Sequence, residues 1–205
     1  MHTTSRRIQD TSGLPAGAGP TRDFVAVDDS GEFSYHRSEQ DFMGAFEYIE
    51  EAACIIDRSG SAYRLALDPN RHLILGRSHG PVEFQWLRHA WMDAQSAHPE
   101  GHRLRRFYPA TRYEVVSDLF ETLALESGTA PAAGAWSLDI DGFASRPSNI
   151  EEIDRLLARQ DRLEHARVKD PFGHIYRPAR HRKHRYLPAA GSILYVEIPA
   201  TAAAH

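Results

Sequence analysis

The chain has 205 residues, a formal net charge of −4, 41% hydrophobic residues and 25% charged residues. These are ordinary values for a globular protein, and they argue against a fibrous repeat or a wholly disordered chain. No stretch approaches the roughly 18 to 20 consecutive apolar residues of a membrane-spanning helix. We therefore expect a soluble protein without a membrane partner.

Residues 1–22 lack the apolar core that a secretory signal requires, and we interpret them as a disordered tail. The single cysteine, Cys54, lies in the apolar run ACII and has no partner for an intramolecular disulfide. A small buried thiol in a reducing compartment is the simplest interpretation. The expected location is therefore the cytoplasm.

Short β-prone runs and turn residues fill the first part of the chain. The runs at 24–28 and 32–35 are joined by Asp-Ser-Gly, which predicts a hairpin. Apolar residues at three- and four-residue spacing after Ser38 predict a helix over about 39–52. A three-stranded meander follows, with strands expected at 54–57, 62–68 and 71–76.

Two helices are predicted in the middle of the chain. The first starts at Pro81 and buries Phe84, Leu87 and Trp91, and Trp86 at the margin of this stripe is a candidate interface anchor if exposed. A strand at 103–108 precedes the second helix, whose apolar stripe runs from 113 to 123.

The small, proline-bearing segment 129–135 marks a boundary. Beyond it we expect a strand at 135–141, a helix capped by Ser148 and Glu151, a basic loop, and a last strand at 192–198. We find no internal repeat. The prediction is an α+β fold, an antiparallel sheet with three or four packed helices, divided into a main domain at 23–128 and a C-terminal extension or small subdomain at 135–205.

Charge is segregated along the sequence. Residues 23–57 contain ten acidic residues and one basic residue. An acidic face favours a cationic partner, although a merely solvated helix face is the alternative. We predict that a protein partner binds at Asp29, Glu32, Glu47, Glu50 and Glu51.

Residues 167–186 have the opposite charge, with seven basic residues against one acidic residue. Arginines interleaved with aromatic residues suit phosphates and stacked bases, so nucleic-acid binding is one interpretation. A loop that folds back on the acidic half and a solvated loop are the others. The nucleic-acid candidates are Arg177, Arg180, Arg182, Lys183 and Arg185.

Motifs for catalysis are weak. The histidines His181 and His184 beside these cations suggest a metal-independent ribonuclease as a further alternative. Zinc motifs, glycine-rich phosphate loops and the Gly-x-Ser-x-Gly elbow are missing from the sequence. We predict no catalytic residues, no metal site and no cofactor.

One stretch resembles a known group of proteins. Residues 24–126 contain the hairpin end FSYHRSEQDF, the segment AFEYIEEA and the run CIIDRSGSAYRLAL. In these features the chain resembles small actinobacterial immunity proteins of polymorphic toxin systems. The resemblance implies a non-enzymatic protein, immunity- or antitoxin-like, that binds and neutralises a basic toxin. Residues 135–205 have no counterpart in that pattern.

Overall fold

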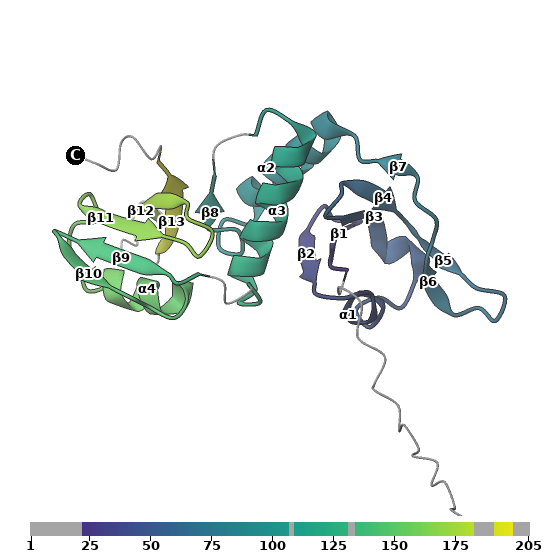
Figure 1. Ribbon diagram of the computed structural model, residues 1–205, viewed down its shortest axis with the longest axis horizontal. Helices are drawn as coiled ribbons and strands as arrows, with labels where there is room; N and C mark the ends of the chain where they lie inside the picture. The colour runs from purple at the N-terminus through teal and green to yellow at the C-terminus, as the bar shows by residue number, and fades with distance from the viewer. Residues whose placement is uncertain (1–21, 107–108, 131–133, 183–190, 199–205) are drawn as a thin grey trace, which may run out of the picture.

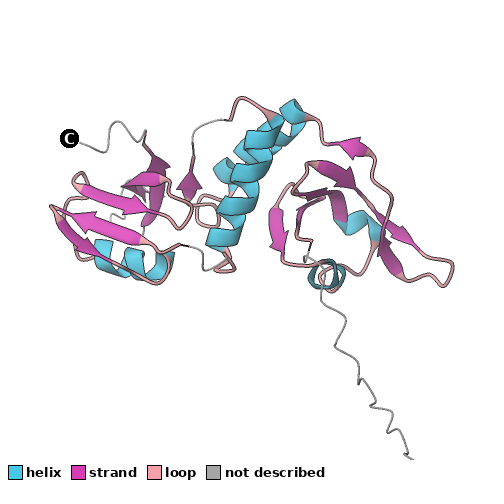
Figure 2. Cartoon of the chain, in the orientation of Figure 1, coloured by secondary structure: helices cyan, strands magenta, loops and turns pink. Residues whose placement is uncertain are grey.

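The computed structural model describes residues 22–106, 109–130, 134–182 and 191–198. It confirms the α+β fold, with two larger, mainly antiparallel sheets on either side of the helices α2 (Phe84–Ala97) and α3 (Arg112–Glu126) (Figure 1). The strands β5 (Leu65–Leu67) and β6 (Leu73–Leu75) form a separate two-stranded sheet. Figure 2 shows the same division, with strands gathered into two groups around these helices. Within the described ranges, no helix combines the length and apolar character that crossing a membrane requires.

The elements follow one another in three groups. The first is β1 (Phe24–Asp28), β2 (Phe33–His36), α1 (Glu39–Met43), the 3-10 helix η1 (Ile49–Glu51), β3 (Ala52–Asp57), β4 (Ser61–Tyr63), β5 (Leu65–Leu67), β6 (Leu73–Leu75) and β7 (Gly80–Pro81). The second is α2 (Phe84–Ala97), β8 (Leu104–Arg105) and α3 (Arg112–Glu126). The third is β9 (Ser137–Ile140), β10 (Phe143–Ser145), α4 (Ile150–Leu157), β11 (Ala166–Lys169), β12 (Ile175–Arg182) and β13 (Gly191–Glu197).

The first sheet has the order β2-β1-β3-β4-β7, and its central strands are covered on both faces. Val25 and Ile56 face the buried stripes of α2 and α3. Phe24 and Ile55 face the other side and pack around Phe42 of α1. Successive side chains of a strand point to opposite faces, so the continuous apolar run of β1 is buried on both sides.

The second sheet has the order β10-β9-β11-β12-β13-β8, and α4 covers one face. Its edge strand β8 comes from before the predicted boundary and pairs in parallel with β13, placing Leu104 opposite Tyr195. Leu104 and Leu125 of α3 are both buried in this second core. Along the chain, the segment 129–135 therefore lies between the first sheet and most strands of the second sheet. The second core nevertheless also contains residues that precede this segment.

The two sheets contain the same structural unit, a hairpin, a helix and a second hairpin. The order β2-β1-β3-β4 of the first sheet matches β10-β9-β11-β12 of the second, with α1 and α4 in the same place in the chain. The register also matches, because Ile55 opposes Tyr63 in one unit as Val168 opposes Tyr176 in the other. Our expectation that the chain has no internal repeat is wrong.

The second hairpin of the first unit is held together by Asp57. Its Oδ1 atom accepts hydrogen bonds from the backbone N–H groups of Ser59 (2.9 Å) and Ser61 (3.0 Å). Its Oδ2 atom accepts one from the hydroxyl of Tyr63 (3.0 Å) and another from Arg22. Burial alone would raise the pKa of Asp57, but a hydrogen bond from the Ser59 hydroxyl, together with the bonds from Arg22, Ser61 and Tyr63, outweighs it and lowers the pKa to about 2.

The second unit repeats this arrangement around Asp170. Its Oδ1 atom accepts from the backbone N–H groups of Phe172 and His174, both at 2.9 Å. Its Oδ2 atom accepts from the hydroxyl of Tyr176 (2.8 Å) and from Arg106 (3.0 Å). We call each set of three side chains an Arg-Asp-Tyr cluster: Arg22, Asp57 and Tyr63 in the first unit, and Arg106, Asp170 and Tyr176 in the second.

The shared sequence behind the two clusters is Asp-x-x-Gly-x-x-Tyr, at 57–63 and 170–176. The glycines, Gly60 and Gly173, have φ angles of +77° and +102°, where a side chain is strained. The arginines come from different places, since Arg22 precedes β1 and Arg106 follows β8. The two segments share only Asp, Gly and Tyr among seven positions. This explains why the repeat is hard to recognise in the sequence.

Several predicted elements need correction. The helix expected over 39–52 stops at Met43, because Gly44 caps it and the chain then crosses to β3 through η1. Pro81 lies in β7, and α2 is instead capped by Glu83, whose carboxylate accepts from the N–H groups of Gln85 and Trp86. The cap of α4 is Asn149 rather than Ser148.

The basic segment 167–186 is not a loop over its described part. Residues 166–169 and 175–182 form β11 and β12, paired with each other and with neighbouring strands on both outer sides. Exposed basic residues occur in half-exposed strands as well as in loops, so composition alone misassigned the segment.

Replacing the two central aspartates should destabilise the fold unequally. Asp170→Asn should lower the free energy of unfolding by about 3 kcal/mol, because it leaves the buried Arg106 guanidinium with one carboxylate fewer. Asp57→Asn should cost about 2 kcal/mol, since its partner Arg22 is half exposed. Urea unfolding at pH 7 measures both. Asp141→Asn is the control, because Asp141 is exposed at a positive φ that Asn also adopts. Losses below about 0.5 kcal/mol at both sites would contradict this role for the clusters.

Candidate functional site

The five predicted partner-binding carboxylates gather at one end of the first sheet. Asp29 and Glu32 lie in the turn between β1 and β2, and Glu47, Glu50 and Glu51 lie in the segment that leads into β3. The register places Asp28 opposite Ala52, so the two segments are neighbours. We call these five residues the acidic end.

The acidic end is not the helix face that the sequence suggested. Glu50 and Glu51 lie in η1, and Glu47 precedes it. The carboxylate of Glu51 is occupied locally, because it accepts from the N–H groups of Glu47 (2.7 Å) and Tyr48 (3.2 Å). Among the described residues, no basic side chain forms an ion pair with any of the five.

A hollow of about 320 Å³ adjoins the acidic end, between the β1–β2 turn and α2. Its walls are the turn residues 28–31 on one side and Trp86 and Asp93 of α2 on the other. Trp86 is 41% exposed, so it meets the condition set for an interface anchor. The floor is formed by small or aliphatic side chains: Val27, Ala53, Ala90, Ala94 and Ala97. We call this cavity the Trp86 hollow.

A β-bulge shapes the floor of the Trp86 hollow. The register between β1 and β3 shifts after Val27, so that Val27 opposes Cys54 whereas Asp28 opposes Ala52. Ala53 is the extra residue between them, and it is exposed, unlike Ala52. Bulges redirect side chains and interrupt regular pairing, which here turns Ala53 toward α2.

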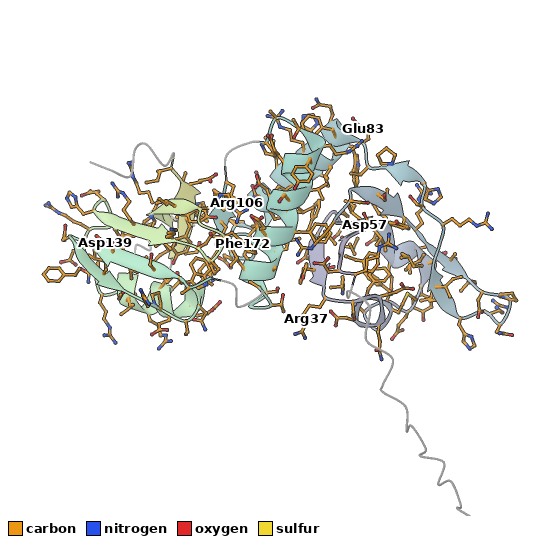
Figure 3. The ribbon with its side chains drawn as sticks, viewed as in Figure 1. Arg37, Asp57, Glu83, Arg106, Asp139 and Phe172 are labelled. Atoms are coloured by element: carbon orange, nitrogen blue, oxygen red, sulfur yellow. The ribbon has the colours of Figure 1, made fainter. Side chains whose placement is uncertain are left out.

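A second hollow of about 580 Å³ shares Trp86 and Ala53 with the first and is lined by Cys54, Arg64, His79 and Glu83, among others. Figure 3 places Glu83 at the β7 end of α2. Burial raises the pKa of the Cys54 thiol, which keeps it protonated and argues against a nucleophilic role. We interpret the paired hollows as a binding surface centred on Trp86.

A second cluster of charged groups lies where α3 meets the second sheet. Figure 3 shows Arg106 at this junction, beside Phe172. The side chain of Arg106 is 4% exposed and pairs with Asp170 (3.0 Å), Glu121 (2.5 Å) and Asp118 (3.3 Å). His174 contacts Glu121 (3.3 Å) and Glu197 (2.6 Å) on the rim of the same cluster.

These groups shift one another's ionisation. Hydrogen bonds to Glu121 and Glu197 raise the pKa of His174 to about 9, against the opposing effect of burial. Burial opposes ionisation of Glu121, but bonds from His174 and Arg106 outweigh it and lower the pKa of Glu121 to about 2. At neutral pH the junction therefore holds charged His174 and Arg106 beside ionised Glu121, whereas burial raises the pKa of Asp118.

Within the described residues, Asp118, Glu121 and His174 are one group whose potential ligand atoms lie within 4.8 Å of one another. A metal ion there would have to displace Arg106 from two carboxylates and remove the proton from His174. We therefore interpret the group as part of an ion-pair cluster. No local sequence pattern indicates this group, because its members come from α3 and from the hairpin turn between β11 and β12.

The predicted nucleic-acid residues are only partly brought together. Arg177 and Arg180 are exposed on β12 but project from opposite faces, and Arg180 donates to the carbonyl of Gln160 (2.6 Å). Arg182 ends β12, while Lys183 and Arg185 lie outside the described residues, as does His184. Arg177 instead shares its face with Arg167 and Lys169, which the sequence analysis did not select.

Comparison with known proteins adds no relative. No family model matches the chain, and no curated protein or solved structure matches it significantly. The resemblance of residues 24–126 to immunity proteins stays a prediction.

The junction should stabilise the fold in a pH-dependent way. Because the pKa of His174 is raised above its unfolded value, its stabilising contribution is present below about pH 6.5 and is lost as the pH rises through about 9. His174→Gln should lower the free energy of unfolding by about 2 kcal/mol at pH 6, allowing for partial exposure, and by little at pH 10. Urea titrations at pH 6, 8 and 10 measure this, with the exposed His89→Gln as control. A loss that is constant with pH would contradict a charged role for His174.

Proposed function

We propose that the chain is a non-enzymatic protein-binding protein, of the immunity or antitoxin kind, whose acidic end binds a basic protein partner. The observation that carries this proposal is the exposed Trp86 in a hollow that opens beside carboxylates without an ion-pair partner among the described residues. Interfaces with this composition combine an apolar anchor with a charged rim that selects the partner.

Exposed apolar side chains within the acidic end support the same function. Tyr48 is 62% exposed and Ile49 is 37% exposed, and both lie between Glu47 and Glu50 in the chain. Aromatic residues in exposed positions are enriched among those that dominate binding energies. Unpaired carboxylates around such residues would speed association with a basic surface.

The proposal is tested with a partner recovered from the cells that encode the chain, then purified and measured by calorimetry. Capture of a partner from these cells is not by itself support for the proposal. The support comes from the affinities of variants for that partner. Glu47→Lys with Glu50→Lys should weaken binding at least tenfold at 50 mM salt and less at 300 mM, because the charges are exposed. Glu51 is left intact, since it holds its own turn. Trp86→Ala should also weaken binding tenfold or more.

Matched controls distinguish a located surface from net charge. Asp161→Lys with Glu164→Lys makes the same charge change at exposed sites after α4, and Phe143→Ala removes an aromatic side chain that is 82% exposed in the second unit. Both should leave the affinity within about twofold. Equal losses from the two lysine pairs would mean that no specific acidic surface exists, and wild-type affinity in all variants would refute the proposal.

A second candidate function is nucleic-acid binding by the second sheet. Arg167, Lys169 and Arg177 share the face of this sheet opposite α4. Of these three only Arg177 belongs to the predicted set, and their charge is partly offset by Asp139 directly opposite Arg167. The ribonuclease alternative depends on His181 and His184, and His184 lies outside the described residues.

Salt dependence tests the second candidate. Binding of a labelled single-stranded RNA, followed by fluorescence anisotropy from 50 to 200 mM salt, should weaken steeply with salt. Lys169→Glu with Arg177→Glu should reduce the slope of log affinity against log salt by about 1.5, as expected for two lost phosphate contacts. Arg159→Glu with Arg162→Glu, exposed after α4, is the control. No binding at 50 mM salt would exclude this function.

A further inference from the structure

The Trp86 hollow has features that select one kind of side chain. On α2, the residues that line it recur at three- and four-residue spacing: Trp86, Ala90, Asp93, Ala94 and Ala97. They therefore form one continuous stripe along the helix. The stripe has a flat aromatic group at one end, a shallow floor of methyl groups, and a carboxylate at its edge.

The opposite wall adds negative charge. One carboxylate oxygen of Asp28 stabilises the turn, because it accepts hydrogen bonds from the N–H groups of Ser30 and Glu32, both at 2.9 Å. Asp29 and Asp93 are exposed and, in the part of the chain that the structure describes, neither carboxylate is paired or hydrogen-bonded. Two free carboxylates thus face the same cavity from different elements.

The end of α2 contributes in the same direction. The hollow reaches Ala97 and His98, where the helix ends, and the last turn of α2 contains no Lys or Arg. The carbonyl groups of a helix C-terminus carry partial negative charge, which favours a cation nearby.

We propose that the Trp86 hollow is a receptor for a single arginine side chain of the partner protein. The guanidinium stacks on the Trp86 indole and forms ion pairs with Asp29 and Asp93, while the methylene groups lie on the alanine floor. Arginine fits better than lysine, because its planar group both stacks and bonds to carboxylates in a fork. This inference rests on the proposed function and names the group that it recognises.

The test uses two peptides that differ in charge but hardly in shape. Acetyl-Gly-Arg-Gly-amide and its citrulline analogue are titrated into the full chain, and the indole N–H signal of Trp86 is followed by NMR. Trp91 and Trp136 are buried and serve as internal references. The arginine peptide should shift the Trp86 signal with a dissociation constant on the order of 10 mM, and the citrulline peptide should not.

Variants locate the site. Asp29→Asn with Asp93→Asn should weaken the arginine peptide about fivefold or more, from two exposed ion pairs. Asp139→Asn with Asp141→Asn, in the second unit, should not change its binding. Equal binding of both peptides, no shift of the Trp86 signal, or equal losses in the two double variants would each overturn the proposal.

The outcomes also separate this inference from the proposed function. A protein partner that needs Trp86, together with an arginine peptide that does not bind, would retain the function and reject the arginine receptor. If the arginine peptide binds selectively but no protein binds at the acidic end, the arginine receptor is retained and the proposed function is rejected.

Discussion

The fold depends on one repeated interaction, an aspartate that closes a hairpin, pairs with an arginine of opposite charge and accepts a hydrogen bond from a tyrosine. Each such aspartate accepts two backbone N–H groups on one oxygen and a tyrosine hydroxyl on the other. A buried carboxylate is costly without a compensating charge, so the hairpin, the tyrosine and the arginine stabilise one another. This arrangement fixes the register of β3 with β4 and of β11 with β12, and hence which residues face each side.

The two units differ at the sheet face that lies opposite α1 in the first unit and opposite α4 in the second. In the first unit, Val25 and Ile56 give an apolar face that α2 and α3 cover. The matching positions in the second unit are Ser137 and Lys169, so that face is polar, and no helix of the described ranges covers it in this way. One architecture therefore produces a buried core in one case and an open, charged sheet in the other. Because α2 packs on the first unit, residues of α2 lie beside the β1–β2 turn, and the Trp86 hollow forms between them.

Local patterns foretold much of the fold but little of the site. The β1–β2 hairpin and the amphipathic stripes of α2 and α3 follow from periodicity and turn residues. The same periodicity extends the first helix to about residue 52, although it ends at Gly44. The acidic residues were found by composition, and Trp86 by its position beside the buried stripe. The hollow itself depends on a bulge at Ala53 and on the pairing of Asp28 with Ala52, which are long-range features that no local pattern encodes. The same holds for Arg106, whose ion-pair partners lie on α3 and in the turn between β11 and β12.

The origin of Arg106 outside the second unit has a consequence for autonomy. A fragment that begins after residue 130 would lack the edge strand β8, the apolar side chain of Leu125 and the only arginine shown to neutralise Asp170 within the described residues. The second unit is thus a copy in shape but not an independent module. Melting of its sheet and of α3 should be coupled, so recombination could exchange this unit between proteins only together with the helical segment that precedes it.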